Sequence, residues 1–193
     1  MYIGAYPFNL PYGTVRDPVT NTLYVADYGN HRVIAYTSNA TSAVLVAGGN
    51  GPGCNTSQLH YPIGLRLNVF TNSLIIVNGA CNNIICLNLD TNNRSVLVGS
   101  EQGISGNTPT LLHGPLYIKF DPMGNLYVSD LLNYRIQFFA YGQTTAVTIA
   151  GKTLKAGSNS TLLDASWAVE LDNQLNLYVA DTENHRIQKF LRY

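Results

Sequence analysis

The sequence predicts an all-β protein, a β-propeller of four units with four antiparallel strands each, and three observations support this prediction. The composition is 46% hydrophobic and only 11% charged, with abundant Asn, Thr, Ser, Gly and Tyr, whereas soluble proteins usually carry about 25% charged residues. One phrase recurs at intervals of 51 or 52 residues, and short apolar runs bounded by turn residues flank it. Repeated units of this length that stack their small sheets on one another describe a propeller.

The recurring phrase supplies the two middle strands of each unit. It reads LYVADYGNHRVIAY at 23–36, LYVSDLLNYRIQFF at 126–139 and LYVADTENHRIQKF at 177–190. A weaker copy, LIIVNGACNNIICL, occupies 74–87. Each copy has two runs rich in Val, Ile, Leu and Tyr on either side of a tight turn, which is typical of a β-hairpin.

The other two strands of each unit come from runs before and after the phrase. The opening runs, all but the last with a Pro, cover 10–15, 61–67, 114–120 and 165–171. The closing runs cover 43–49, 95–100 and 146–151. Runs such as LIIV and VLVA lack polar alternation, so we expect both faces of the sheets to be buried.

We expect one domain over 1–193, with repeats at approximately 8–49, 59–100, 112–151 and 163–193. The last repeat ends after its third strand. Residues 1–7 resemble a closing run, so we predict that 2–5 pair with 185–191 and close the ring. The alternative is a part of a larger, six-bladed propeller, in which exposed blade edges would favour self-association unless more chain covers them.

The phrases ADYGNHRV and ADTENHRI closely resemble the NHL repeat, which is named for its Asn-His-Leu core. The resemblance covers essentially the whole chain as four copies, strong in the first and fourth, good in the third and degraded in the second. It implies an NHL-type β-propeller, and relatives usually have six blades. It implies no single function, because NHL propellers occur in TRIM-NHL ubiquitin-ligase proteins, in a peptide-amidating lyase and in bacterial surface sensors.

Acidic and basic residues recur within the phrase at a fixed separation of five positions. The pairs are Asp27 with Arg32, Asp130 with Arg135, and Asp181 with Arg186. A hairpin brings the members of each pair together, so we predict that they form a structural frame and do not act in catalysis. In the second copy both charges are lost together, to Asn78 and Asn83, as expected if each charge needs the other, since a lone buried charge costs about 3–5 kcal/mol. The Asn residues of the turns, Asn30, Asn133 and Asn184, suit left-handed or Asx geometry.

The histidines do not predict a metal site. His31 and His185 share their position with Asn82 and Tyr134, so no shared ligand set recurs. His60 and His113 precede the first strand of their units, where packing or loop hydrogen bonding is the first interpretation and a metal or substrate role the alternative.

A rim of loops on one face is the predicted partner-binding surface, because variable residues on a fixed turn frame are where recognition is tuned. A protein or glycan ligand would fit there; packing against neighbouring loops is an equally weighted alternative. The candidate residues of this rim are Tyr28, His60, His113, Leu131, Leu132 and Tyr134.

No catalytic, cofactor-binding or metal-binding residues are predicted. The formal net charge is zero and only 11 Lys and Arg are present, which argues against the RNA binding known in some TRIM-NHL relatives. The sequence has no nucleophile elbow, phosphate loop or HExxH motif. We therefore predict a non-catalytic binding scaffold; the alternative is a propeller-type metal-dependent lyase or hydrolase.

The longest uncharged stretch, 67–89, contains six Asn and is too polar to cross a membrane. The scarcity of Lys and Glu, with N-glycosylation sequons at Asn39, Asn55, Asn93 and Asn159, favours an extracellular setting over the cytoplasm.

The three cysteines follow no metal-binding spacing. Cys81 and Cys86 could pair, and a buried free thiol is just as plausible; Cys54 has no predicted partner.

Overall fold

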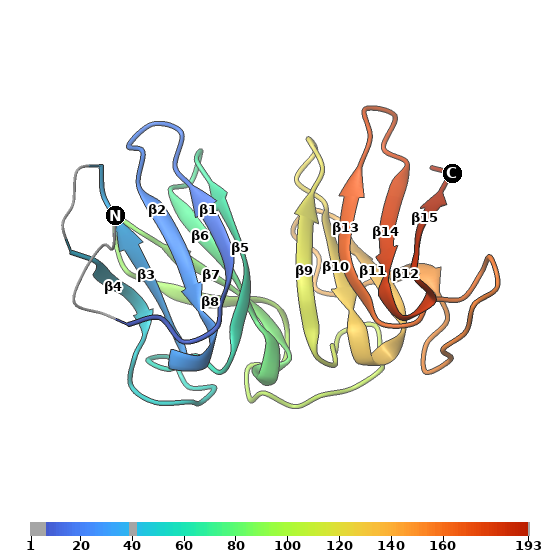
Figure 1. Ribbon diagram of the computed structural model, residues 1–193, viewed down its shortest axis with the longest axis horizontal. Helices are drawn as coiled ribbons and strands as arrows, with labels where there is room; N and C mark the ends of the chain where they lie inside the picture. Colours follow the sequence, from blue (N-terminus) through green and yellow to red (C-terminus); the bar gives the residue numbers. More distant parts are fainter. Residues whose placement is uncertain (1–6, 39–41, 193) are drawn as a thin grey trace.

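The computed structural model describes residues 7–38 and 42–192, and its strands form four separate antiparallel sheets, here called blades 1 to 4 (Figure 1). Blade 1 contains β1 (Pro11–Arg16), β2 (Leu23–Asp27), β3 (Arg32–Tyr36) and β4 (Val44–Gly48). Blade 2 contains β5 (Pro62–Asn68), β6 (Ser73–Asn78), β7 (Asn83–Asn88) and β8 (Arg94–Gly99). Blade 3 contains β9 (Pro115–Phe120), β10 (Leu126–Asp130), β11 (Arg135–Phe139) and β12 (Val147–Gly151). Blade 4 contains β13 (Ser166–Leu171), β14 (Leu177–Asp181) and β15 (Arg186–Phe190).

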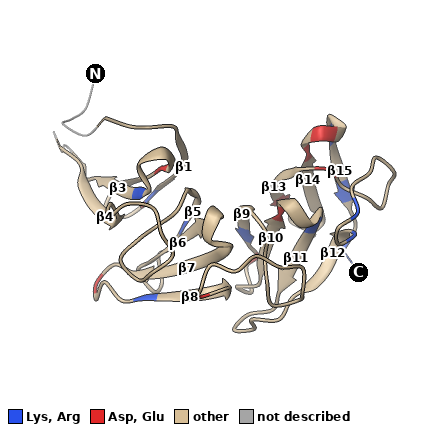
Figure 2. Cartoon of the chain, turned by 90° about the horizontal axis from the view of Figure 1, so that it is seen from below, with Lys and Arg blue, Asp and Glu red and all other residues tan. Residues whose placement is uncertain are grey.

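The blades follow one another in an arc in chain order, with blades 1 and 4 at its two ends (Figures 1 and 2). The first strands β1, β5, β9 and β13 form the inner side of the arc, and each packs on the next. Strand order within each blade is sequential, as expected for a meander. This arrangement makes every blade cover one face of its neighbour.

Three apolar layers between successive blades form the core. Tyr24, Ala26 and Val33 of blade 1 pack against blade 2, in a cluster that includes Leu65 and Ile76. Equivalent clusters join blade 2 to blade 3 and blade 3 to blade 4. The run LIIV at 74–77 lies in β6 and is buried on both faces, as expected. The same expectation is wrong for VLVA at 44–47, because this run forms the outer strand β4, where Val44 and Leu45 are 59% and 53% exposed.

The approach between the first strands is close enough to restrict side-chain size. A Cβ added to Gly13 of β1 would lie 2.0 Å from the carbonyl oxygen of Ile63 in β5. Only glycine lets the two backbones meet at this point of the junction.

Two kinds of turn connect the first three strands of each blade and lie at its opposite ends. Between the first and second strands, an Asp or Asn side chain accepts hydrogen bonds from backbone N–H groups two to four residues later, which is Asx-turn geometry. These residues are Asp17, Asn68, Asp121 and Asp172. Between the second and third strands, a single 3-10 turn precedes a left-handed residue. These turns are η1 (Tyr28–Asn30), η2 (Gly79–Cys81), η3 (Leu131–Asn133) and η4 (Thr182–Asn184).

The left-handed position differs from the one expected from the sequence. Asn30, Asn133 and Asn184 lie inside the 3-10 turns, and the next residue is left-handed instead, with φ between 51° and 55°. The left-handed residues are His31, Asn82, Tyr134 and His185. The Asn residues are needed elsewhere, because their side chains bond a carboxylate across the turn.

The predicted β-propeller of four antiparallel blades is confirmed. Six-bladed is the wrong description for the residues that the structure describes, which form four blades. The predicted closure by 2–5 lies outside the described residues. Within the described ranges, no helix has both the length and the apolar character to cross a bilayer.

Candidate functional site

The end of the propeller that carries η1–η4 and the loops linking the blades is here called the turn face. Its recurring feature is a buried carboxylate with three hydrogen-bond donors. In blade 3, Asp130 Oδ1 accepts the backbone N–H of His113 at 2.7 Å. Asp130 Oδ2 accepts Asn133 Nδ2 and Arg135 Nε, each at 2.8 Å. Blades 1 and 4 repeat this set around Asp27 and Asp181.

The outer nitrogens of the arginine extend the set to the loop that leads into the same blade. Arg135 donates to the carbonyl oxygens of Asn107, Thr108 and Leu111 at 2.8–3.1 Å. Arg186 does the same with Ser158, Asn159 and Leu162 in blade 4. We call this unit of Asp, Asn and Arg the brace, since it joins the hairpin turn, the first strand and the linking loop.

In blades 1, 3 and 4 the Asp of the brace is always accompanied by its Asn and its Arg, and electrostatics explains why. The three carboxylates are fully buried, and an unpaired buried charge would destabilise the fold by several kcal/mol. Burial raises the pKa of the Asp130 carboxyl, and the bonds from His113, Asn133 and Arg135 act in the opposite direction. Because both its oxygens accept bonds within the fold and it is fully buried, this carboxylate does not face a substrate.

Blade 2 keeps part of the brace with neutral side chains. Asn78 Oδ1 accepts the N–H of His60 at 2.8 Å, as the aspartates do. Asn83, at the arginine position, instead donates to the carbonyl of Ser100 at 2.6 Å. Arg94 of β8 takes over a loop contact, because it donates to the carbonyl of Gln58 at 2.5 Å, the counterpart of Leu111 in blade 3.

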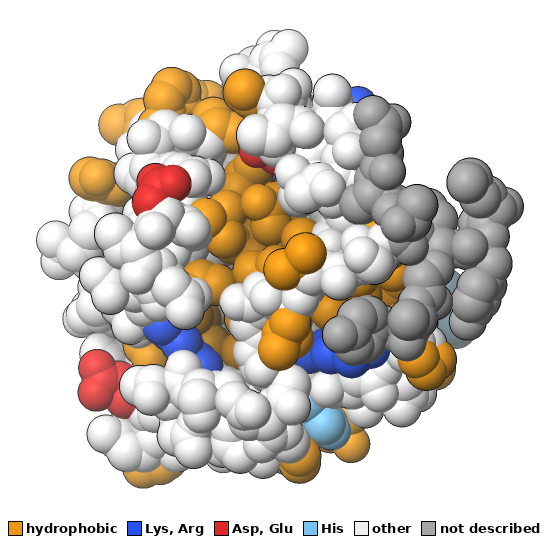
Figure 3. Space-filling model, turned by 90° about the vertical axis from the view of Figure 1, so that its left-hand side faces the viewer, with side chains coloured by type: hydrophobic (Ala, Val, Ile, Leu, Met, Phe, Trp, Pro, Cys, Tyr) orange, Lys and Arg blue, Asp and Glu red, His pale blue; other side chains and the backbone are white. Residues whose placement is uncertain are grey.

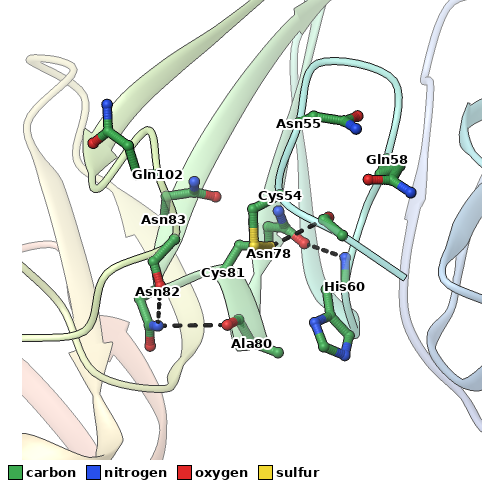
Figure 4. Close-up of a disulfide and its surroundings, with 12 residues drawn as sticks. Cys54, Asn55, Gln58, His60, Asn78, Ala80, Cys81, Asn82, Asn83 and Gln102 are labelled. Carbon is green, nitrogen blue, oxygen red and sulfur yellow. Dashed lines mark hydrogen bonds between the residues drawn. A yellow bond between two sulfur atoms is a disulfide. The ribbon is translucent and has the colours of Figure 1, made fainter. Parts of the chain in front are cut away.

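A disulfide between Cys54 and Cys81 replaces the rest of the brace in blade 2 (Figure 4). Cys81 occupies the turn position held by Asn133 in blade 3, and Cys54 lies at the loop position of Asn107. Cys81 Sγ also contacts the carbonyl of Gly53, just as Asn133 Nδ2 bonds the carbonyl of Gly106. The loop is therefore tied to the turn by a covalent bond where blade 3 uses hydrogen bonds to loop carbonyls.

The possible pairing of Cys81 with Cys86 is thus wrong. Cys86 is a half-buried free thiol within β7. The alignment of the repeats carried the missing signal. Cys81 aligns with Asn133, and Cys54 aligns with Asn107, which follows the glycine whose carbonyl Asn133 bonds.

The junction of blades 1 and 2 carries a group of five rings on the turn face, here called the Tyr–His cluster. Its members are Tyr12, Tyr28, His31, His60 and Tyr61. The Tyr61 ring stacks with that of Tyr28 and with that of His60, with ring centroids 4.5 and 4.8 Å away. Tyr12 is 50% exposed and Tyr61 is 37% exposed.

A hydrogen bond across the same junction involves the left-handed residue of blade 1. His31 Nδ1 accepts the backbone N–H of Tyr61 in blade 2 at 3.2 Å. Burial lowers the pKa of His31, and the neighbouring His60 lowers it further. At the next junction Asn82 plays the same part, because its Oδ1 accepts the N–H of Gly114 at 2.9 Å.

Of the predicted rim, Tyr28 and His60 belong to this cluster, and the remaining residues lie around η3 at blade 3. Leu132 is 46% exposed and packs over Gly114, whereas Leu131 and Tyr134 are half-buried. His113 contributes its backbone N–H to the brace. The structure thus gathers the rim residues into two groups. Sequence reasoning missed Tyr12 and Tyr61, although both precede or begin a first strand, at the edge where the rim was expected.

Open cavities occur at the seams between blades, and their linings mix polar and apolar residues. One, of about 300 Å³, lies between β4 and the outer part of blade 2 and includes Leu45, Leu87 and Arg94 in its lining. Hydrophobic side chains gather in the hollow on this side of the molecule (Figure 3). Across 7–38 and 42–192, no three His, Cys, Asp or Glu residues are grouped so that they could hold a metal ion.

Comparisons with known proteins agree with this architecture. The NHL repeat profile matches residues 167–190, so the recognition of NHL repeats is confirmed. The Protein SUPPRESSOR OF QUENCHING 1, chloroplastic, from Arabidopsis thaliana is 25% identical over 202 residues, which cover 93% of this chain and 19% of that protein.

Solved structures show the same fold at low identity. A protein of unknown function from Bacteroides thetaiotaomicron superimposes with a TM-score of 0.74 at 15% identity, over 94% of this chain and 47% of that one. An auxiliary nutrient binding protein from the same organism gives 0.69 at 17%, over 92% and 46%. A streptogramin B lyase gives 0.69 at 13%, over 97% and 53%. The chain thus spans about a fifth of the plant relative and about half of these structures.

The disulfide predicts a specific pattern of stability. Cys54→Ser with Cys81→Ser should lower the free energy of unfolding by about 2–4 kcal/mol, since a closed loop is lost from the unfolded state. Cys54→Ser with Cys81→Asn should recover about 1 kcal/mol, because the amide can donate to Gly53 as Asn133 does to Gly106. Urea unfolding measures both variants. Cys86→Ser is the control and should change little; equal stability of the two double variants would contradict the role assigned to position 81.

We expect His31 to make the stability of the protein depend on pH, and an Asn at this position, as at Asn82 of blade 2, to remove that dependence. Its pKa is lowered in the fold, so the unfolded chain binds the proton more readily. Stability is then complete above about pH 6.5 and falls as the pH drops toward the folded pKa. His31→Asn should keep the bond to Tyr61, as Asn82 does with Gly114, and flatten the pH profile by up to about 1 kcal/mol. His185→Asn is the matched control, and an unaltered profile in His31→Asn would refute the explanation.

Proposed function

We propose that this protein is a non-catalytic binding propeller whose turn face recognises a protein or glycan ligand, with the Tyr–His cluster at the centre of the binding surface. The observation that carries the proposal is the gathering of three tyrosines and two histidines at one blade junction. At the corresponding places of the next two junctions, Tyr61 is replaced by Gly114 and Ala165. The cluster is therefore an addition to the repeat and is not required by it.

The composition of this surface supports binding. Tyrosine is enriched among the residues that dominate binding energy, because it offers a large apolar area with a polar tip. Leu10 and Leu132 add exposed apolar area on the same face. Burial raises the pKa of Tyr28, with smaller contributions from Tyr12 and Tyr61, so the Tyr28 hydroxyl stays a neutral donor at physiological pH.

The frame beneath the surface supports recognition by a rigid site. The brace and the disulfide fix the linking loops to the hairpin turns at each blade. A surface held in its binding conformation loses less entropy when a ligand binds. The same bonds occupy the Asp and Arg side chains, which removes the most obvious charged groups from catalytic use.

An oxidising compartment, with an extracellular location first, belongs to the same proposal. A disulfide persists in such compartments and is rare in the reducing cytosol. Cys54–Cys81 supports this placement together with the sequons of the linking loops. A streptogramin B lyase and a nutrient binding protein share the fold at 13% and 17% identity, so the fold by itself does not decide between catalysis and binding.

Screening of the full chain against a glycan array and a displayed peptide library tests the proposed function. A ligand found in either screen should bind at least about tenfold more weakly to Tyr12→Ala and Tyr61→Ala, because each removes an aromatic contact worth more than 1 kcal/mol. Tyr141→Ala removes an even more exposed tyrosine far from the cluster and is the matched control. Ligands whose affinity is unchanged by both cluster variants would contradict the proposal.

A further inference from the structure

The end of the propeller opposite the turn face carries large apolar side chains at one recurring position (Figure 1). The turns between the first and second strands of blades 1, 2 and 3 hold Val19, Phe70 and Met123, each two residues after the Asp or Asn that starts the Asx turn. These side chains are 81%, 97% and 69% exposed. An Asx turn needs only the acceptor at its start, and blade 4 has Gln174 at this position. The exposed apolar side chains are therefore not required by the turn.

A groove opens beside Phe70, at the seam between blades 2 and 3, and is here called the seam groove. Its volume is about 290 Å³. Val69 and Phe70 of blade 2 and Phe120 and Pro122 of blade 3 supply apolar walls, and Arg66 adds a guanidinium group to the lining. Pockets for small ligands usually measure about 300–1,000 Å³. The seam groove is at the lower end of this range, which suits the side chains of a short segment.

Hydrogen bonds hold both sides of the seam groove in place. On one side, Asn68 Oδ1 accepts the backbone N–H of Phe70 at 3.1 Å. On the other side, Asp121 Oδ1 accepts the N–H of Met123 at 2.9 Å, and its Oδ2 accepts Asn125 Nδ2 at 2.8 Å. Both oxygens of this lining carboxylate are thus used within its own turn. A groove that is already formed loses less entropy when a ligand binds.

Arg66 gives the seam groove a positive charge that is not paired within the fold. Its guanidinium group lies 4.4 Å from the centroid of the Tyr117 ring, and its Nη1 donates to the carbonyl of Leu65 at 2.8 Å. Across the part of the chain that the structure describes, no carboxylate forms a salt bridge with it. A guanidinium carries five N–H donors in a planar fork. Most of these donors are therefore available to an added carboxylate.

The seam between blades 3 and 4 shows how a cation at the same position is neutralised. Lys119 in β9 and Glu170 in β13 stand at the strand position of Arg66 in β5. They form an ion pair with one another. The equivalent neighbour of Arg66 is Lys119, which is also a cation. Glu170 is close enough to interact electrostatically with Arg66, but its ion pair is with Lys119. The seam between blades 2 and 3 thus lacks the carboxylate that the next seam contains.

We propose that the seam groove binds a peptide segment that carries a carboxylate next to large apolar side chains. The carboxylate pairs with Arg66 in a charge-assisted, bidentate contact, and an apolar side chain enters between Phe70 and Phe120. Charge favours this occupant over a bilayer surface. Asn72, in the same turn as Phe70, bonds the exposed Asp90 at 2.7 Å, and a carboxylate beside the apolar tips opposes binding to anionic lipid.

Selection of a displayed peptide library on the full chain, with counter-selection against the Arg66→Gln variant, supplies the probes. The recovered peptides should contain Asp or Glu beside Phe, Leu or Ile. Their affinity should fall at least about tenfold in Arg66→Gln, because a charge-assisted pair is lost. Arg16→Gln is the matched control, since it removes the same charge at the end of β1, where Asn21 already bonds the guanidinium. This variant should bind the peptides as the native chain does.

A double-mutant cycle between protein and peptide separates direct contact from a structural effect. Replacing the acidic residue of the peptide by its amide should weaken binding to the native chain at least about tenfold and change little in Arg66→Gln. Phe70→Ser should weaken binding at least about tenfold, while urea unfolding stays unaltered because this side chain is so exposed. Val19→Ser is the matched control in blade 1. Tyr61→Ala should leave peptide binding intact, so the outcome is independent of the function proposed for the turn face.

Different occupants of the seam groove give different results, and each would overturn the proposal. A selection that yields no peptide, or peptides for which the losses at Arg66 and at the peptide carboxylate are additive, leaves the ionic contact without support. Binding to vesicles of phosphatidylcholine and phosphatidylserine that is lost in Phe70→Ser makes a bilayer the occupant. A dimer detected by sedimentation and lost in Phe70→Ser makes a second copy of the chain the occupant.

Discussion

A carboxylate buried at a hairpin turn is the constraint on which the rest of this propeller depends. Desolvation makes such a group costly unless donors surround it. In blade 3, Asp130 receives donors from the backbone before β9, from Asn133 and from Arg135. The same bonds fix the first strand, the turn and the incoming loop in one arrangement. Repetition of this unit sets the spacing of the blades along the chain.

Blade 2 shows which connections the brace has to make, because it joins the same first strand, turn and loop through different side chains. Asn78 keeps the bond to the first strand, Arg94 reaches the loop from the outer strand, and the Cys54–Cys81 bond joins loop to turn. Replacing an ion pair by neutral groups and a covalent bond removes both charges at once. With the frame secured in these two ways, the left-handed residues beside it vary, and two of them, His31 and Asn82, accept hydrogen bonds across the blade junctions.

Much of this could be predicted from the sequence, and the remainder depended on contacts between repeats. The period placed every strand, and the joint loss at Asn78 and Asn83 indicated that Asp and Arg satisfy one another. Pairing of Cys54 with Cys81 was missed because it follows from three-dimensional equivalence of a loop and a turn. The Tyr–His cluster was only half anticipated, since ring stacking joins residues about thirty positions apart, from Tyr28 to Tyr61. The sequence shows which positions vary between repeats, but it does not show which of these side chains contact one another in the fold.

A double-mutant cycle in blade 3 tests the central claim most directly, by giving Asp130 and Arg135 the residues of blade 2. Asp130→Asn and Arg135→Asn should each destabilise the protein, the arginine change by about 3–5 kcal/mol, since it leaves a buried carboxylate without its partner. The double variant should lose less than the sum of the two, with a coupling of at least about 1 kcal/mol. Additive losses, or singles as stable as the native chain, would contradict a structural brace.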